Sequence, residues 1–202
     1  LPLIALQYHE VKVIVNWGTI TGSTDHKLYV DYIYLDTDER RRFAQVSHEY
    51  LIEQVQHESV ANGATTATLN FNHPVKELVL HGAWANGAFA NLDGTAGNPA
   101  LTTTMTLKLN GHERFAPRPL TYFTGAQVLQ HHSGEGGFVD LSIGVYSFAL
   151  KPEEHQPSGT CNFSRIDTAQ LVCGATTAAN VYAVNYNVLR IMSGMGGLAY
   201  SN

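Results

Sequence analysis

The chain has 202 residues, of which 44% are hydrophobic and only 14% are charged. Soluble domains average about 25% charged residues, yet the chain has no run of about 18 apolar residues that would cross a membrane. Its aromatic content argues against disorder. The net charge of −5 argues against a nucleic-acid backbone as the main partner, because such a partner selects a basic surface. These values are typical of a β-rich protein that packs against copies of itself.

The N-terminal part of the chain predicts strands followed by a short helix. Residues 11–17 alternate as a half-buried strand, and residues 4–8 have the opposite parity, which predicts a bulge between them. Residues 28–36 are apolar on both faces and predict a central strand. Residues 36–39 (DTDE) resemble a helix N-cap, so we expect a short helix over about residues 38–45.

Six charged side chains gather around this helix. They are Asp36, Asp38, Glu39, Arg40, Arg41 and Arg42. Ion pairs at i,i+4 are expected from Asp36 to Arg40 and from Asp38 to Arg42. The group is a candidate intersubunit contact, and a solvated helix face is the alternative interpretation.

The remaining strands are predicted from period-two patterns. The segments are residues 48–57, 66–71, 75–84, 103–110, 143–150, 180–192 and an extended piece within 163–172. In the segment 180–192, the pattern predicts that Tyr182 and Val184 point inward, whereas Asn185 and Asn187 point outward. Pro119 predicts the start of a second short helix that runs to about residue 130.

Two connections between these strands are unusually polar and small, at residues 58–65 and 85–102. A long structureless connection inside a compact domain is uncommon and is usually functional. Many short strands with Gly-rich connections predict an all-β fold. The expected architecture is an eight-stranded antiparallel jelly-roll sandwich with one or two short helices in its connections. We expect residues 1–202 to form a single domain.

The residue types that carry enzyme chemistry form no recognisable motif in the sequence. Ten histidines are present, but no His-x-His pair occurs, and the adjacent His131 and His132 would point to opposite faces of a strand. Cys161 and Cys173 are expected to be reduced thiols. We therefore expect no enzyme activity, no metal and no cofactor. Residues 162–164 (NFS) make Asn162 a formal glycosylation site, although such triplets are frequent by chance.

Several longer segments carry a family resemblance. They are residues 1–11 (LPLIALQYHEV), 32–45 (YIYLDTDERRRFAQ), 48–54 (HEYLIEQ), 72–75 (NHPV), 109–115 (LNGHERF), 145–167 (VYSFALKPEEHQPSGTCNFSRID) and 181–202 (VYAVNYNVLRIMSGMGGLAYSN). These segments resemble the major capsid proteins of nucleocytoplasmic large DNA viruses, of the iridovirus and phycodnavirus type. The similarity spans the chain from end to end.

The resemblance implies the C-terminal jelly roll of a double jelly-roll subunit, with the N-terminal jelly roll absent from these residues. In that family, homotrimers form pseudo-hexagonal capsomers that tile an icosahedral shell around an inner membrane and the DNA. The implied partners are further copies of the chain, minor capsid proteins and vertex proteins. The inner membrane would lie nearby, without direct contact to nucleic acid. The implied location is the virion, after assembly in the host cytoplasm.

The connections 58–65 and 85–102 match the outward-facing variable regions of the family. The candidate outer-surface residues are Trp84, Asn86, Phe89, Asn91, Asp93 and Asn98. The same residues support the alternative function, a carbohydrate-binding jelly roll of the lectin or host-attachment kind, because aromatic and amide side chains suit a sugar site. A cupin-like enzyme is a second alternative, which metal analysis would decide.

Overall fold

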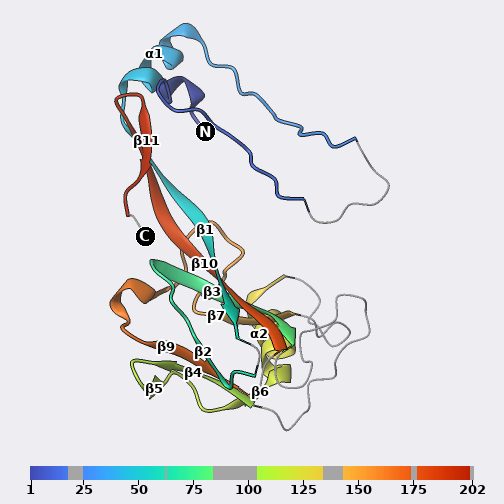
Figure 1. Ribbon diagram of the computed structural model, residues 1–202. Helices are drawn as coiled ribbons and strands as arrows, with labels where there is room; N and C mark the ends of the chain where they lie inside the picture. The colour runs from blue at the N-terminus through green and yellow to red at the C-terminus, as the bar shows by residue number, and fades with distance from the viewer. Residues whose placement is uncertain (18–24, 62, 84–103, 134–142, 174–176, 201–202) are drawn as a thin grey trace. The chain divides into compact units, whose positions relative to one another are not determined.

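The structure is a computed structural model that describes residues 1–17, 25–61, 63–83, 104–133, 143–173 and 177–200 (Figure 1). The chain divides into two compact units. One contains residues 1–51 together with 188–201, and the other contains residues 52–187.

The helical elements are short and the strands carry most of the fold. The helical elements are η1 (Leu3–Ala5), α1 (Thr37–Gln45), the π-helical turn η2 (Tyr122–Ala126), α2 (Gln127–His131) and η3 (Phe163–Arg165). The strands are β1 (His48–Val60), β2 (Thr66–Thr68), β3 (Pro74–Ala83), β4 (Thr104–Leu109), β5 (His112–Glu113), β6 (Arg118–Pro119), β7 (Ile143–Ser147), β8 (Cys161–Asn162), β9 (Ala169–Val172), β10 (Thr177–Met192) and β11 (Met195–Leu198).

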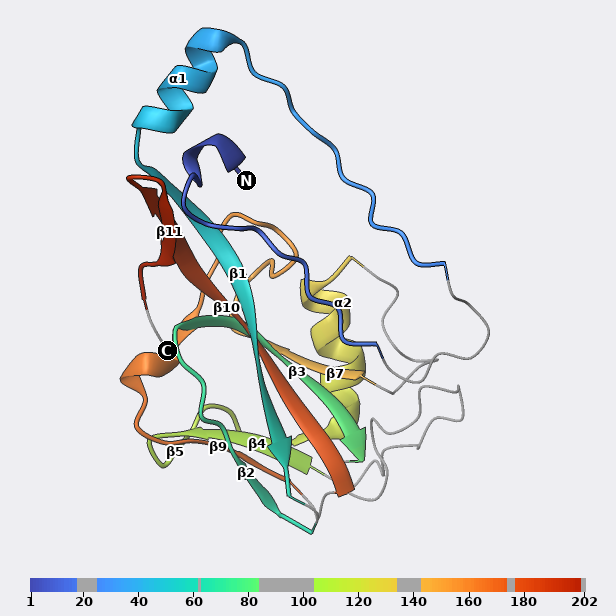
Figure 2. The same cartoon turned by 45° about the horizontal axis from the view of Figure 1, so that its top comes forward.

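The strands form two sheets. One sheet has the order β1-β10-β3-β7, with β11 paired to β10 and β8 paired to β3, and the other has the order β2-β9-β4-β5, with β6 paired to β4. Each described register is antiparallel, as between β3 and β10 and between β4 and β9. Figure 2 shows β10 and β3 side by side, with β4 and β9 in a separate layer. The expected all-β jelly-roll class is confirmed. The described residues form eleven strands rather than eight, because bridges as short as β5, β6 and β8 are included.

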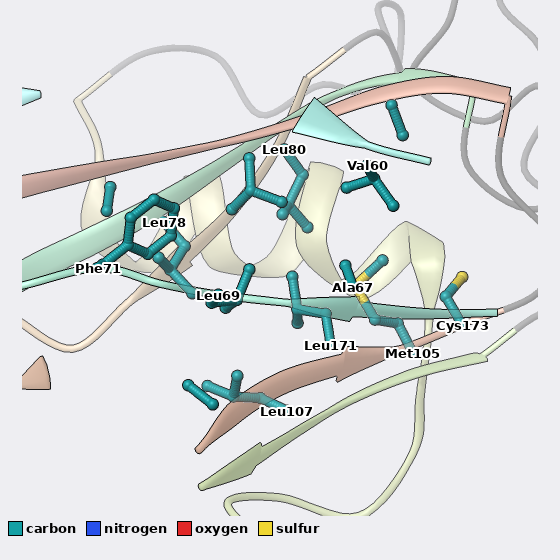
Figure 3. Close-up of a cluster of buried hydrophobic side chains, with 14 of the residues drawn as sticks. Val60, Ala67, Leu69, Phe71, Leu78, Leu80, Met105, Leu107, Leu171 and Cys173 are labelled. Atoms are coloured by element: carbon teal, nitrogen blue, oxygen red, sulfur yellow. The ribbon is translucent and has the colours of Figure 1, made fainter. Parts of the chain in front are cut away.

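The core lies between the two sheets of the unit formed by residues 52–187. Leu78 and Leu80 of β3 point from one sheet toward Leu107 of β4 and Leu171 of β9 on the other (Figure 3). The period-two prediction for residues 66–71 is confirmed, since Ala67, Leu69 and Phe71 are buried and the residues between them are exposed. Apolar burial of this kind is the main favourable contribution to folding.

The predicted inward face of β10 is wrong for the half of the strand that pairs with β3. There the fully buried side chains are Ala179, Val181 and Ala183, whereas Tyr182 and Val184 are partly exposed. Val181 and Ala183 pair with Leu80 and Leu78 of the core. The register with β3 is irregular between Val184 and Asn185, but the odd-numbered residues of β10 are buried on both sides of this point.

The asparagines that the pattern placed on the outer face follow the same alternation as Val181 and Ala183 and are buried as well. Asn185 is 0% and Asn187 2% exposed. Their amides donate hydrogen bonds, Asn185 Nδ2 to the carbonyl of Asn72 at 3.2 Å and Asn187 Nδ2 to Oε1 of Gln54 at 2.9 Å. These bonds offset the cost of burying a polar group.

Strand β4 departs from strict alternation at Thr106. This side chain is 5% exposed although both its neighbours are also buried. Its Oγ1 donates a 2.7 Å hydrogen bond to the carbonyl of Phe115. This hydrogen bond lets the threonine be buried on the face that the pattern assigned to polar residues.

A two-residue turn joins β4 to β5. Leu109 pairs with His112 across it, and the turn residues Asn110 and Gly111 both have positive φ angles, of 51° and 81°. This is the hairpin geometry that an Asn-Gly pair favours. The dipeptide itself is therefore a sequence signal for the turn, in addition to the alternation that predicts the strand before it.

Candidate functional site

The predicted helix near residue 38 is confirmed as α1. The carboxylate of Asp36 accepts hydrogen bonds from the backbone N–H groups of Asp38 and Glu39, both at 3.0 Å. This is the N-cap that the sequence predicts, and it satisfies donors that the helix itself leaves without partners. At the other end, Nε2 of His48 lies 2.8 Å from the carbonyl of Phe43.

The six charged side chains at α1 are all exposed, and no residue of the helix is buried. The expected i,i+4 pairs are wrong: the described ion pair joins Arg41 to Asp38 at i,i+3, over 3.8 Å. Within the described part of the chain, Arg40 and Arg42 have no carboxylate within ion-pair distance. A nine-residue helix with no buried face is only marginally stable by itself. The exposed side chains of α1 therefore form a charged surface that is available for contact with another protein surface.

Two extended segments near the N-terminus expose large apolar side chains. The strands predicted at residues 11–17 and 28–36 are wrong as regular elements in this structure, because neither segment has a described strand partner. Their exposed residues include Ile14, Trp17, Tyr29, Ile33 and Tyr34, of which Tyr34 is 90% exposed. At the close of the first segment, the Trp17 ring stacks on His26 with centroids 4.2 Å apart. Monomeric proteins rarely expose contiguous apolar surface on this scale, and such surface marks a site of interaction.

The predicted outer-surface residues are not placed by the structure. Trp84, Asn86, Phe89, Asn91, Asp93 and Asn98 lie outside the described residues. Asn162, the candidate glycosylation site, is exposed and lies in β8. Its Oδ1 accepts a 3.1 Å hydrogen bond from the backbone N–H of Ser164, so it caps η3.

A buried lysine forms a short ion pair between β3 and β1. Lys76 is only 4% exposed, and its Nζ lies 2.7 Å from Oε1 of Glu53 and 5.6 Å from the centroid of the Tyr186 ring. Burial raises the pKa of Tyr186, against the opposing effect of Lys76. This group of residues holds β1, β3 and β10 together, and it offers no open site to a ligand.

The described residues contain no group of three or more His, Cys, Asp or Glu side chains arranged to hold a metal ion. Cys161 is partly exposed and Cys173 is buried, and both are thiols. Burial raises the pKa of the Cys161 thiol, which disfavours the reactive thiolate. Among the described helices, none has the length and apolarity needed to cross a bilayer.

A family model described as large eukaryotic DNA virus major capsid protein matches residues 39–197. The chain belongs to this major capsid protein family. The match extends from α1 through β10 to β11, so it covers all of the sandwich described above.

Individual members of the family are closely similar to the chain. The major capsid protein of Pyramimonas orientalis virus is 52% identical over an alignment that covers 100% of this chain and 57% of that protein. The major capsid protein of Paramecium bursaria Chlorella virus 1 is 42% identical, over an alignment that covers 100% of this chain and 63% of that protein. The chain therefore spans about three fifths of the length of these capsid proteins.

A solved capsid structure confirms the fold within the family. The quasi-atomic model of the PBCV-1 virus capsid superposes with a TM-score of 0.69 at 39% sequence identity, covering 84% of this chain and 55% of that chain. The Faustovirus major capsid protein is 14% identical with a TM-score of 0.52, which supports the same fold alone.

Proposed function

We propose that the chain forms part of a viral major capsid protein and that its function is self-association into the shell of the virion. The family membership carries this proposal, together with the exposed apolar and charged side chains of the segments near the N-terminus and of α1. The relatives are named as capsid proteins, which favours a structural role over carbohydrate binding.

The mechanism of self-association is geometric. A rigid sandwich presents its sides to neighbouring subunits, and specific interfaces usually bury about 1,200–2,000 Å². We expect a homotrimer with a pseudo-hexagonal outline, and trimers that pack into an icosahedral lattice. Minor capsid and vertex proteins would be further partners, with an inner membrane nearby and no direct contact to nucleic acid. Assembly in the host cytoplasm and the lack of enzyme activity belong to the same proposal.

We propose that the sandwich is the second jelly roll of a double jelly-roll subunit. The exposed apolar side chains of the segments 11–17 and 28–36 support this hypothesis. The sequence predicts a half-buried strand for the first segment and a strand apolar on both faces for the second, so both need β structure packed against them. Further β structure of the same subunit is the natural cover for them. The single domain expected over residues 1–202 remains a prediction.

Helix α1 is the proposed site of intersubunit ion pairs. Its exposed arginines have acidic neighbours, and the single described pair is long, so both signs of charge remain available to a neighbouring subunit. Exposed pairs contribute little one at a time, but in a shell each contact is repeated in every subunit.

The oligomeric state of the full-length protein tests the proposal. Light scattering and electron microscopy should show a trimer that tiles into sheets, and a stable monomer at high concentration would overturn the capsid function. Replacing Arg40 and Arg42 with Glu should lower the trimer fraction, most strongly at low salt. The matched control is Lys151→Glu, which reverses another exposed charge in an i,i+3 pair and should leave assembly unchanged. Equal loss in both variants would refute the role of α1.

A further inference from the structure

An imidazole lies between two carboxylates at the end of α2. Nε2 of His132 is 3.1 Å from Oε2 of Glu77 on β3, and its Nδ1 is 3.3 Å from Oε1 of Glu153 in the turn that follows β7. Three segments that are distant in sequence therefore meet at one side chain. All of them belong to the unit formed by residues 52–187.

Two atoms of this cluster depend on each other. The side chains of His132 and Glu77 are 20% and 11% exposed. Oε2 of Glu77 and Nε2 of His132 are fully buried, and neither has a hydrogen-bond partner among the described residues, although the two atoms lie 3.1 Å apart. A buried polar atom without a hydrogen-bond partner destabilises the fold. The cluster therefore stabilises the fold only when a proton lies between Nε2 of His132 and Oε2 of Glu77.

Counting protons shows which state is favourable. A neutral imidazole carries one N–H, and an ionised carboxylate can only accept. With a neutral ring and two ionised carboxylates, one of the two contacts would set lone pair against lone pair. One additional proton, on the ring or on Glu77, turns both contacts into hydrogen bonds.

The groups around the cluster assign different roles to the two carboxylates. Burial raises the pKa of Glu77, although His132 and Lys76 oppose the effect. Hydrogen bonds from Ser133 lower the pKa of Glu153, with His132 adding to them. The backbone N–H of Ser133 donates to Oε2 of Glu153 at 3.0 Å. Glu153 therefore remains an acceptor, and Glu77 is the carboxylate that shares the additional proton with His132.

The other charged groups nearby are already engaged. Lys76 is paired with Glu53 at 2.7 Å, and Lys151 is paired with Glu154 at 3.0 Å. The neighbouring His131 contacts a neutral group, since its Nδ1 lies 3.0 Å from the carbonyl of Leu150.

We propose that Glu77, His132 and Glu153 form a proton-operated clasp that holds the end of α2 against β3 and the 150–154 turn. The clasp is closed while it carries the shared proton and opens when that proton leaves. The capsid domain is therefore held most firmly at weakly acidic pH, and the end of α2 loosens as the pH rises. Histidine is the side chain best suited to such a response near neutrality.

Hydrogen exchange on the intact chain tests the clasp. Between about pH 5.5 and about pH 8.5, after correction for intrinsic rates, the opening of residues 131–133 and 150–154 should increase several-fold, because the shared proton is lost over this range. His132→Gln should remove this pH response. His131→Gln is the matched control, since it alters the adjacent histidine but no carboxylate contact, and it should retain the response.

The clasp is overturned if His132→Gln responds to pH as the unaltered chain does, or if His131→Gln loses the response equally. A measurement on the unaltered chain covers the case in which His132→Gln does not fold. Nitrogen NMR of the ring and carbon NMR of the Glu77 carboxyl at about pH 5.5 should locate the shared proton on one of the two groups. A neutral ring beside an ionised Glu77 at that pH would overturn the proposal.

Discussion

Asn110 has two separable roles in the hairpin between β4 and β5, and replacing it tests both. Its φ of 51° lies in the left-handed region, which asparagine tolerates better than alanine does. Its Oδ1 accepts hydrogen bonds from the backbone N–H groups of Asp167 and Thr168, at 2.9 and 3.0 Å. Its own N–H donates to the carbonyl of Thr168 at 2.7 Å, a bond that a substitution preserves. The side chain thus anchors the segment that leads into β9.

The expected cost of Asn110→Ala combines the two roles. The left-handed conformation costs an alanine about 1 kcal/mol. Two lost hydrogen bonds cost about 0.5–1.5 kcal/mol each, and because Asn110 is exposed, the lower end applies. We therefore expect Asn110→Ala to lower the free energy of unfolding by about 2 kcal/mol, which corresponds to a Tm decrease of about 4–8 °C for a chain of this size.

Urea unfolding followed by circular dichroism measures this change, and Asn110→Gly separates the two contributions. Glycine removes the hydrogen bonds but adopts the positive φ without strain, so it should cost about 1 kcal/mol. Asn70→Ala is the control, because Asn70 is also exposed and its described bond to Glu58 is long, at 3.4 Å. It should change the stability by less than about 0.5 kcal/mol.

Two results would refute this reasoning. If Asn110→Ala and Asn110→Gly destabilise equally, the left-handed backbone contributes nothing. If both are as stable as the unaltered chain, the hydrogen bonds to the 167–168 segment contribute nothing.

Three further predictions concern the core, a close backbone contact and the pH dependence. Leu107→Ala should cost about 3 kcal/mol, because Leu107 is fully buried between the sheets; a cost below about 1 kcal/mol in urea unfolding would contradict this position. Gly159→Ala should lower the free energy of unfolding by about 2 kcal/mol, because Gly159 has a φ of 144° and an added Cβ would lie 2.9 Å from the Phe148 carbonyl oxygen. An unchanged Tm would refute this close contact. Burial raises the pKa of Glu77, so the folded state binds this proton more tightly than the unfolded state does, and stability should decline as the pH rises above the usual carboxyl range. Glu77→Gln should flatten that decline in unfolding measured across pH, and an unchanged slope would show that another group causes it.

The local patterns of the sequence predicted those elements whose environment is periodic. The buried Ala67, Leu69 and Phe71 follow strict alternation. The N-cap Asp36 has a signal within a few residues of itself. The family resemblance, confirmed by the match over residues 39–197, rests on the residues alone. Charge and composition likewise indicate assembly, because a surface poor in charge is unfavourable for a lone monomer.

The tertiary structure decided what depends on partners distant in sequence. The inward face of β10 carries Val181 and Ala183, because these residues pair with Leu80 and Leu78 of the core. No pattern within β10 contains that information. The sequence predicts a half-buried strand at residues 11–17 and a central strand at residues 28–36, yet the large apolar side chains of both segments are exposed here. Alternation indicates which side chains favour burial, but it does not identify the element that covers them. The cluster of Glu77, His132 and Glu153 joins residues that no spacing rule connects. Local sequence thus determined most of the strands and the family to which they belong, whereas the side-chain contacts that set burial and protonation arise only when the sheets pack together.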